Sequence, residues 1–334
     1  MGGVKKSRYH QMTAAGLLAL FLIFFCSLCI GRYTISLSGC IRILAGREMG
    51  QTAQNVIFSL RLPRTLASML VGMALSAAGT VFQSTFCNKL VSPDILGVTS
   101  GACVGAASAI LLGLSARTVS IVAFSSGVLA VCITLLVARA IRNRSSIVLV
   151  LSGVIVSSLM NSILGLLKFI ADPNRQLAEI TYWMMGSLAG VALSDVISVL
   201  PFILLPLLLL LLLRWRLNVL ALGELQASSL GMNYQLMRLT MIGCGTLLTA
   251  AAVCISGSIS WVGLVVPHFS RMLVGEDRMR ALPLSILLGG NFMILADLLA
   301  RTLSMNEIPL SIITGFIGTV VYIGLLVKRG CDIP

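Results

Sequence analysis

Residues 194–213 read SDVISVLPFILLPLLLLLLL, a stretch of twenty residues whose only charged side chain is Asp195, near its start. A helix of about 20 mostly apolar residues is long enough to span the hydrocarbon core of a bilayer. Similar apolar runs recur along the chain between short polar segments. They are residues 14–31, 65–84, 95–113, 118–138, 147–170, 194–213, 238–256, 259–274, 281–300 and 308–327. We therefore predict about ten membrane spans.

The composition argues against a soluble globular protein. Of the 334 residues, 57% are hydrophobic and 10% are charged, whereas soluble domains carry about 25% charged residues. A lipid-exposed backbone must satisfy its hydrogen bonds internally, and the alternating pattern of a barrel strand is absent. We expect an all-α integral membrane protein in which residues 1–334 form a single transmembrane domain.

The basic residues indicate an orientation in the membrane. The net charge of +13 comes from Lys and Arg in short runs between apolar segments, which is typical of basic cytoplasmic loops and not of a nucleic-acid-binding protein. The first span follows Lys5, Lys6 and Arg8, but it is long and lacks a clear cleavage site, so we expect an uncleaved helix. Ten spans with a cytoplasmic N-terminus put most basic residues inside, so both termini are predicted to be cytoplasmic.

Several function classes lack their characteristic residues. No Gly-x4-Gly-Lys-Ser/Thr loop occurs, so the chain does not bind ATP in the P-loop manner. The two histidines, His10 and His268, form no His-Glu-x-x-His motif, and no nucleophile has an evident base, which argues against an enzyme. No cluster of His, Cys and carboxylates suits a bare metal ion, so no metal site is expected.

An ion-coupled secondary transporter is one function that the predicted membrane spans would allow. Such a protein needs carboxylates inside its spans. Asp297 alone lies well inside one, while Lys168 and Asp195 lie near predicted ends. Asp297 and Arg301 are four residues apart on one helix, so we predict a local salt bridge between them.

One polar segment is predicted to meet another protein. Residues 214–237 mix apolar positions with Glu224, Gln226, Ser228, Ser229 and Asn233. This pattern is typical of short amphipathic helices on the membrane surface. An idle loop is the alternative for this segment.

Four blocks of residues, in order along the chain, carry a resemblance to a known family. They are Arg61 to Ala102, with the motif Arg61-Leu-Pro-Arg64; Leu217 to Gly231; Gly257 to Gly275, with Gly263-Leu-Val-Val-Pro-His268; and Asp297 to Gly318. Together they resemble the FecCD-type permeases, which import ferric siderophores, haem and cobalamin. The chain departs from the family pattern at Lys89, Trp261 and Val320.

The resemblance implies a type II ATP-binding-cassette (ABC) importer permease fold. It implies two ATPase subunits, a second permease subunit that is identical or related, and an extracytoplasmic substrate-binding protein, in the plasma membrane of a bacterium or archaeon. ATP and magnesium would bind to the ATPase, so no cofactor is expected in this chain. A ferric siderophore or similar iron chelate is the expected cargo, with cobalamin or haem as the alternative.

The resemblance also implies roles for individual residues. Binding-protein docking is expected at Arg61, Arg64 and Arg301. Coupling to the ATPase is expected at Leu222, Gly223, Glu224, Ala227, Leu230 and Gly231. Small hydroxyl residues are expected to line the pathway at Ser157, Ser158, Ser311 and Thr314. Structural roles are expected for Gln83, Asn88, Pro93, Gly97, Gly263, Pro267, His268, Arg271 and Asp297.

Overall fold

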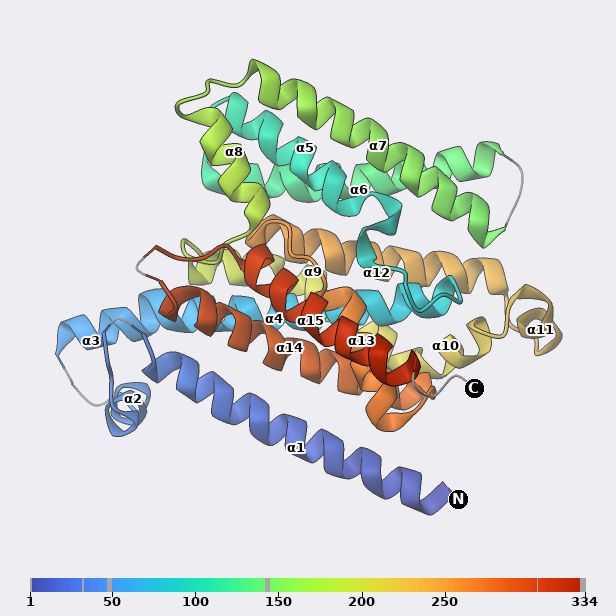
Figure 1. The fold of residues 1–334 in the computed structure, drawn as a ribbon, viewed down its shortest axis with the longest axis horizontal. Coiled ribbons are helices and arrows are strands. Elements are labelled where there is room, and N and C mark those ends of the chain that lie inside the picture. The colour runs from blue at the N-terminus through green and yellow to red at the C-terminus, as the bar shows by residue number, and fades with distance from the viewer. Residues whose placement is uncertain (1, 32, 47–49, 142–144, 305, 331–334) are drawn as a thin grey trace.

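Every predicted span coincides with a helix. The computed structural model describes residues 2–31, 33–46, 50–141, 145–304 and 306–330, and its regular elements in these ranges are all helical (Figure 1). The helices at the predicted spans are α1 (Gly2–Cys29), α4 (Leu62–Thr85), α5 (Val98–Leu111), α6 (Ala116–Ala140), α7 (Ser146–Ile170), α9 (Leu193–Leu212), α12 (Tyr234–Ser256), α13 (Val262–Val274), α14 (Arg278–Thr302) and α15 (Leu310–Gly330). The prediction of an all-α membrane protein is confirmed.

Not all of these helices have the length of a full span. Among the described residues, seven helices are long and apolar enough to cross a membrane, whereas α5 and α13 are shorter apolar helices of 14 and 13 residues. Backbone geometry shortens α5 and α13. Gly97 precedes α5 with φ +86°, and α13 lies between Trp261 (φ +70°) and Gly275 (φ +89°), conformations that a continuing right-handed helix excludes. The exact number of spans stays a prediction.

Shorter helices occupy the connections. They are α2 (Leu37–Leu44), α3 (Gln51–Asn55), the π-helix η1 (Val56–Arg61), the 3-10 helix η2 (Pro93–Leu96), α8 (Gln176–Met185), α10 (Arg214–Leu220) and α11 (Glu224–Ser229). α3 and η1 run directly into α4 as one helix from Gln51 to Thr85, so this helix begins well before the predicted span 65–84. α8 was not predicted. Its last turn is tied to the start of α15, because the Leu310 amide donates to the Gly186 carbonyl at 3.0 Å.

α4 runs through the centre of the bundle, with α5 to α8 on one side and α1 on the other (Figure 1). The neighbouring helices α13 and α14 pack so closely that their backbones touch that of α4. A Cβ on Gly72 would lie 2.1 Å from the Gly289 carbonyl oxygen of α14, and one on Gly79 would lie 1.8 Å from the Gly263 carbonyl oxygen of α13. Small residues permit such approach between helices in lipid, where the hydrophobic effect does not drive association.

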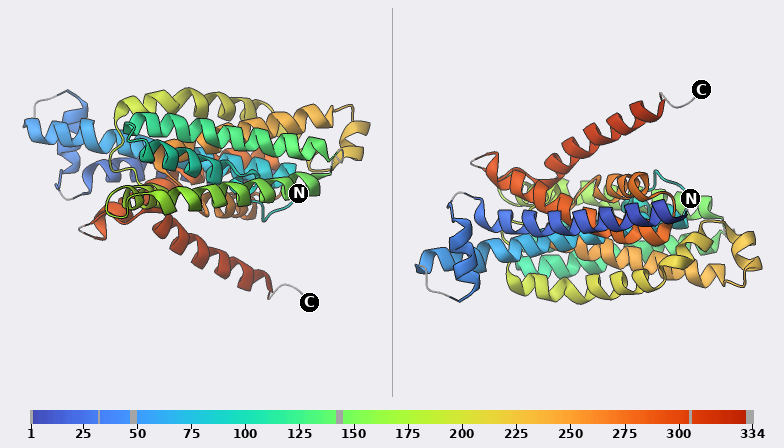
Figure 2. Two further views of the ribbon diagram at one scale, coloured as in Figure 1. Left: turned by 90° about the horizontal axis from the view of Figure 1, so that it is seen from above. Right: turned by 90° about the horizontal axis from the view of Figure 1, so that it is seen from below.

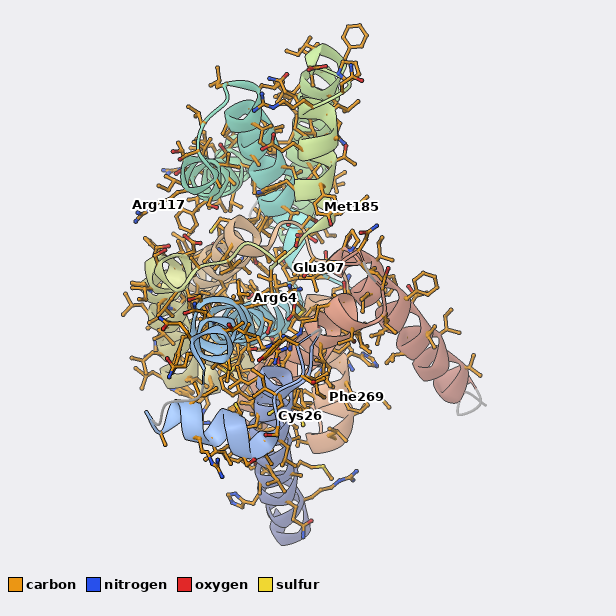
Figure 3. The ribbon with its side chains drawn as sticks, turned by 90° about the vertical axis from the view of Figure 1, so that its left-hand side faces the viewer. Cys26, Arg64, Arg117, Met185, Phe269 and Glu307 are labelled. Atoms are coloured by element: carbon orange, nitrogen blue, oxygen red, sulfur yellow. The ribbon has the colours of Figure 1, made fainter. Side chains whose placement is uncertain are left out.

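Buried charges join α1, α4 and α14 at the end of the bundle where α2 and α3 lie. The Arg64 guanidinium is 2.8 Å from the Asp297 carboxylate and 2.7 Å from that of Glu307, and Figure 3 shows Arg64 and Glu307 inside this end. The predicted pair of Asp297 and Arg301 is present at 3.9 Å. Arg301 also donates to the Ser27 hydroxyl of α1 at 2.6 Å. Asp297 is fully buried, so these arginines compensate its charge inside the protein.

Substitution Gly79→Ala should destabilise the bundle by about 1–3 kcal/mol. The added methyl group would clash with backbone atoms of Gly263, which cannot move aside as a flexible side chain could. Gly165→Ala is the matched control, since no atom lies within 4 Å of a Cβ at that helical position. The melting temperature of the purified chain in detergent measures the difference. Equal melting temperatures for the two variants would contradict the close approach of α4 and α13.

Substitution Arg64→Gln should lower stability by about 3–5 kcal/mol, because it removes the nearest positive charge from the buried Asp297. The exposed Arg42 on α2 offers the control Arg42→Gln. Adding Asp297→Asn to Arg64→Gln should restore part of the loss by removing the uncompensated charge. A double variant less stable than Arg64→Gln alone would show that the ion pair is not the source of the effect.

Candidate functional site

α10 and α11 form a small amphipathic unit at one end of the bundle. The first residues of α1 and the last turn of α15 lie toward the same end (Figure 1). On the inner side of the unit, Leu217, Leu220 and Ala227 are fully buried. On its outer side Leu222, Leu225 and Leu230 are exposed, and Leu225 is 88% accessible. The prediction of short amphipathic helices in segment 214–237 agrees with this arrangement.

Two glycines bracket α11. Gly223 joins α10 to α11 with φ +92° and ψ 171°, a region of backbone space that is essentially restricted to glycine. Gly231 follows α11 with φ +78°. Glu224, at the start of α11, accepts a hydrogen bond from Gln235 of α12 at 2.7 Å. The orientation of α11 therefore depends on the Gly223 backbone, on the exposed contact between Glu224 and Gln235, and on the burial of Ala227.

Asn218 clamps α10 to the beginning of α14. Its side-chain nitrogen donates to the Asp277 carboxylate at 2.8 Å, and its side-chain oxygen accepts from the Arg278 amide at 2.9 Å. Asp277 is also the N-cap of α14, since it accepts from the Met279 amide at 3.1 Å. A cap residue fixes the direction in which the chain enters a helix. α10 and α14 are thus connected by side chains that also define the start of α14.

A polar cluster beside this clamp brings together several residues expected to be structural. Arg271 donates to the Gln83 side-chain oxygen at 2.6 Å, and the Gln83 amide lies 3.4 Å from the Gly263 carbonyl. The Glu276 carboxylate accepts a hydrogen bond from the Lys89 ammonium group at 2.6 Å and lies 3.8 Å from the Arg271 guanidinium. Partial burial opposes ionisation of Glu276, but the hydrogen bond and charge of Lys89 and the charge of Arg271 outweigh it and hold its pKa below the ordinary value.

The remaining motif residues shape turns and packing. The Asn88 side chain accepts from the Leu90 amide at 2.9 Å and closes the turn after α4. Pro93 opens η2, and its ring occupies the place of a Cβ on Gly263. Pro267 lies inside α13. His268 is buried, with its ring 6.0 Å from that of Tyr322 in α15.

The three arginines predicted to meet a binding protein are buried within this chain. Arg61, Arg64 and Arg301 are 6%, 8% and 8% accessible. Arg61 donates to the carbonyls of Leu28 at 2.7 Å and Cys29 at 2.9 Å and to that of Tyr33. All three therefore act on internal partners, and their docking role stays a prediction. Glu307, which pairs with Arg64, escaped sequence reasoning because it lies in a connection and not in a predicted span.

The residues predicted to line a pathway differ in exposure. On α7, Ser158 is exposed and Ser157 is half-buried; on α15, Ser311 is half-buried and Thr314 is fully buried. Figure 2 shows α15 leaving the bundle along its length. The face that it presents is apolar, with Phe316 72% accessible. The pathway assignment stays a prediction, and in the described part of the chain no group of three or more His, Cys, Asp or Glu could hold a metal ion.

Known proteins resemble the chain over nearly its whole length. The permease MolB of a molybdate import system from Haemophilus influenzae is 41% identical over 313 residues, which cover 91% of this chain and 92% of MolB. A probable iron chelatin permease from Helicobacter pylori is 35% identical, with 96% of this chain and 98% of the relative covered. The vitamin B12 permease BtuC of Escherichia coli O127:H6 is 34% identical, with 94% and 93% covered.

Solved structures show the same architecture. An inward-facing ABC transporter described as of the metal-chelate type matches with a TM-score of 0.86 and 37% identity, covering 96% of this chain and 99% of that one. PsaBC from Streptococcus pneumoniae, solved with a Fab, shares the fold at a TM-score of 0.60 and 17% identity, with 85% and 94% covered. The model of the FecCD transport family matches residues 18–328. This chain therefore belongs to the FecCD transport family and is a membrane permease of the ABC importer type.

Proposed function

We propose that this chain is the permease subunit that carries an iron chelate across the plasma membrane by alternating access, with energy from separate ATPase subunits. The observation that carries the proposal is the match to a metal-chelate type transporter over 96% of the chain. The relative from Helicobacter pylori, named for an iron chelatin, supports the same cargo class. Both termini, α10 and α11 would then lie on the cytoplasmic side of the membrane.

The unit formed by α10 and α11 is our candidate surface for the ATPase. Exposed apolar side chains grouped outside a membrane span mark a surface that another protein covers. Leu222, Leu225 and Leu230 form such a group, while the buried Ala227 holds α11 to the bundle. Through Asn218, a displacement of α10 reaches the first turn of α14. This connection would convert closure of the ATPase subunits into helix movement.

A second permease subunit would cover the apolar faces of α7 and α15. Phe169 on α7 is 86% accessible, and α15 diverges from the rest of the bundle (Figure 2). Two chains facing each other through these helices would enclose a pathway beside Ser158 and Ser311. The substrate-binding protein would dock at the opposite end from α11, on a surface that the buried Arg61, Arg64 and Arg301 support from within.

The cargo would cross as an intact complex. The predicted pathway offers hydroxyl groups, and the described residues contain no cluster of metal ligands that would compete for a bare ion. Molybdate is the second candidate cargo, because MolB is 41% identical to this chain and serine hydroxyls also donate hydrogen bonds to an oxyanion. Cobalamin is the third, by the similarity to BtuC.

An uptake panel tests the proposal. Vesicles that contain this chain with its ATPase and binding-protein partners should accumulate a radiolabelled ferric siderophore only when ATP is present, and omission of the ATPase should abolish uptake. Labelled molybdate and cobalamin are measured in parallel. Accumulation of molybdate alone would replace the iron chelate as cargo, and uptake driven by a proton gradient without ATP would refute the importer.

Gly223→Val should uncouple ATP hydrolysis from uptake. A β-branched residue cannot adopt the Gly223 backbone conformation without strain of about 1–3 kcal/mol, so α11 would reorient while the membrane helices stay intact. Uptake should fall by about tenfold or more while hydrolysis continues. Ser229→Val, at an exposed position of α11, is the control. Equal uptake by the two variants would remove Gly223 from the coupling route.

A further inference from the structure

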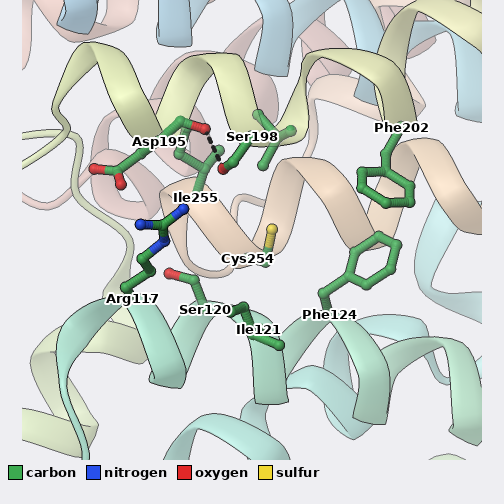
Figure 4. A pocket seen from close by; sticks show the side chains of 10 residues that line it. Arg117, Ser120, Ile121, Phe124, Asp195, Ser198, Phe202, Cys254 and Ile255 are labelled. Carbon is green, nitrogen blue, oxygen red and sulfur yellow. Dashed lines mark hydrogen bonds between the residues drawn. The ribbon is translucent and has the colours of Figure 1, made fainter.

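A cavity lies between α6, α9 and α12, away from α10 and α11. Its larger part encloses about 850 Å³ and reaches α8, and an adjoining part encloses about 290 Å³. Figure 4 shows the smaller part, with side chains from α6 and α9 pointing into it from opposite sides. Both parts are bordered by Arg117, Ser120, Asp195, Cys254 and Ile255.

The cavity changes from charged to apolar along the helices. Arg117 and Asp195 lie in the first turns of α6 and α9, where these membrane helices begin. One to two turns further in, the lining is mostly apolar and contains Ile121, Ser198, Val199, Phe124 and Phe202. The rings of Phe124 and Phe202 are 4.9 Å apart and close the inner end. This order of groups matches a membrane, whose polar headgroups lie above hydrocarbon chains.

The two charges face each other without forming a direct ion pair. No Arg117–Asp195 contact within 4.0 Å is present in the described structure, although Figure 4 shows both side chains directed into the same space. Asp195 accepts a hydrogen bond from the Ala192 amide at 3.0 Å, which caps α9. Glu179 of α8 adds a second carboxylate to the wall of the larger part. A cation and two carboxylates thus line the charged end of a mostly apolar cavity.

We propose that this cavity binds one zwitterionic phospholipid molecule. The phosphate lies against Arg117, whose planar guanidinium binds phosphate oxygens through paired hydrogen bonds. The ammonium group lies against Asp195, and an acyl chain fills the groove between α6 and α9 that ends at Phe124 and Phe202. Phosphatidylethanolamine has this chemistry, because its phosphate and its primary ammonium group are two carbons apart. An anionic phospholipid would bring a phosphate but no cation for Asp195.

The bound lipid would brace two parts of the bundle. α6 belongs to the layer formed with α5, α7 and α8, whereas α9 packs with α12 beside α4 (Figure 1). A ligand that binds only the folded protein raises its stability in proportion to the logarithm of its concentration. The proposal concerns lipid binding alone and holds for any cargo of the importer.

The test is native mass spectrometry of the purified full-length chain in detergent, with equal amounts of phosphatidylethanolamine and phosphatidylglycerol added. The unmodified protein should retain phosphatidylethanolamine preferentially and melt at a higher temperature in its presence. Arg117→Gln should reduce retention of this lipid about tenfold or more, because the phosphate loses its charged hydrogen-bond donors. Ile121→Trp, which fills the groove, should reduce retention of both lipids. Arg42→Gln, an exposed arginine on α2, should change nothing.

Asp195→Asn separates headgroup selection from folding. Asparagine still accepts the hydrogen bond from the Ala192 amide at the start of α9, so the variant should fold and still retain lipid, but without a preference for phosphatidylethanolamine. Equal retention of the two lipids by the unmodified protein would overturn the role of Asp195. Unchanged retention in both Arg117→Gln and Ile121→Trp would overturn the site. Displacement of the lipid by a ferric siderophore would identify the cavity as a cargo site and also overturn the proposal.

Discussion

The backbone approach of α4 to α13 and α14 is the constraint on which the bundle depends. In lipid the helices gain little from leaving their surroundings, so close packing has to supply their association. Gly72 and Gly79 of α4 meet Gly289 and Gly263 with no space for a side chain on any of them. This packing also places polar groups at both ends of α4, where Arg64 reaches Asp297 and Gln83 reaches Arg271.

Hydropathy located the membrane helices but not their ends. Ten apolar runs coincide with ten helices because burial in lipid requires apolar side chains over the whole length of a span. The breaks at Gly97, Trp261 and Gly275 depend on backbone angles, and tryptophan gives no warning of a positive φ. α8 escaped prediction because its sequence, QLAEITYWMM, is too polar and too short for a span. Its position depends on contacts with distant segments.

At the candidate sites, too, contacts between residues close in sequence could be predicted, whereas contacts between distant residues could not. The pair of Asp297 and Arg301 follows from a spacing of four residues on one helix. The shorter contact of Asp297 is with Arg64, 233 positions away, and only the folded chain reveals it. The sequence could not predict the burial of Arg61, Arg64 and Arg301, because the sequence pattern of an arginine at a helix end is the same whether it faces solvent or a carboxylate. Segment 214–237 was recognisable because its amphipathic pattern is local.

α14 connects the two ends of the molecule that the proposed function requires. Its 25 residues extend about 37 Å as a helix, enough to span the hydrocarbon core. At its first turn, Asp277 and Arg278 are held by Asn218 of α10. At its last turns, Asp297 and Arg301 join the ion network of Arg64 and Glu307. Pro283 lies inside α14 between its first turn and Gly289, where the helix packs against α4. A push on α10 would travel along the axis of α14 to the extent that this packing limits bending at the proline. The network at the far end, next to the start of α15, is therefore where such a push would be felt.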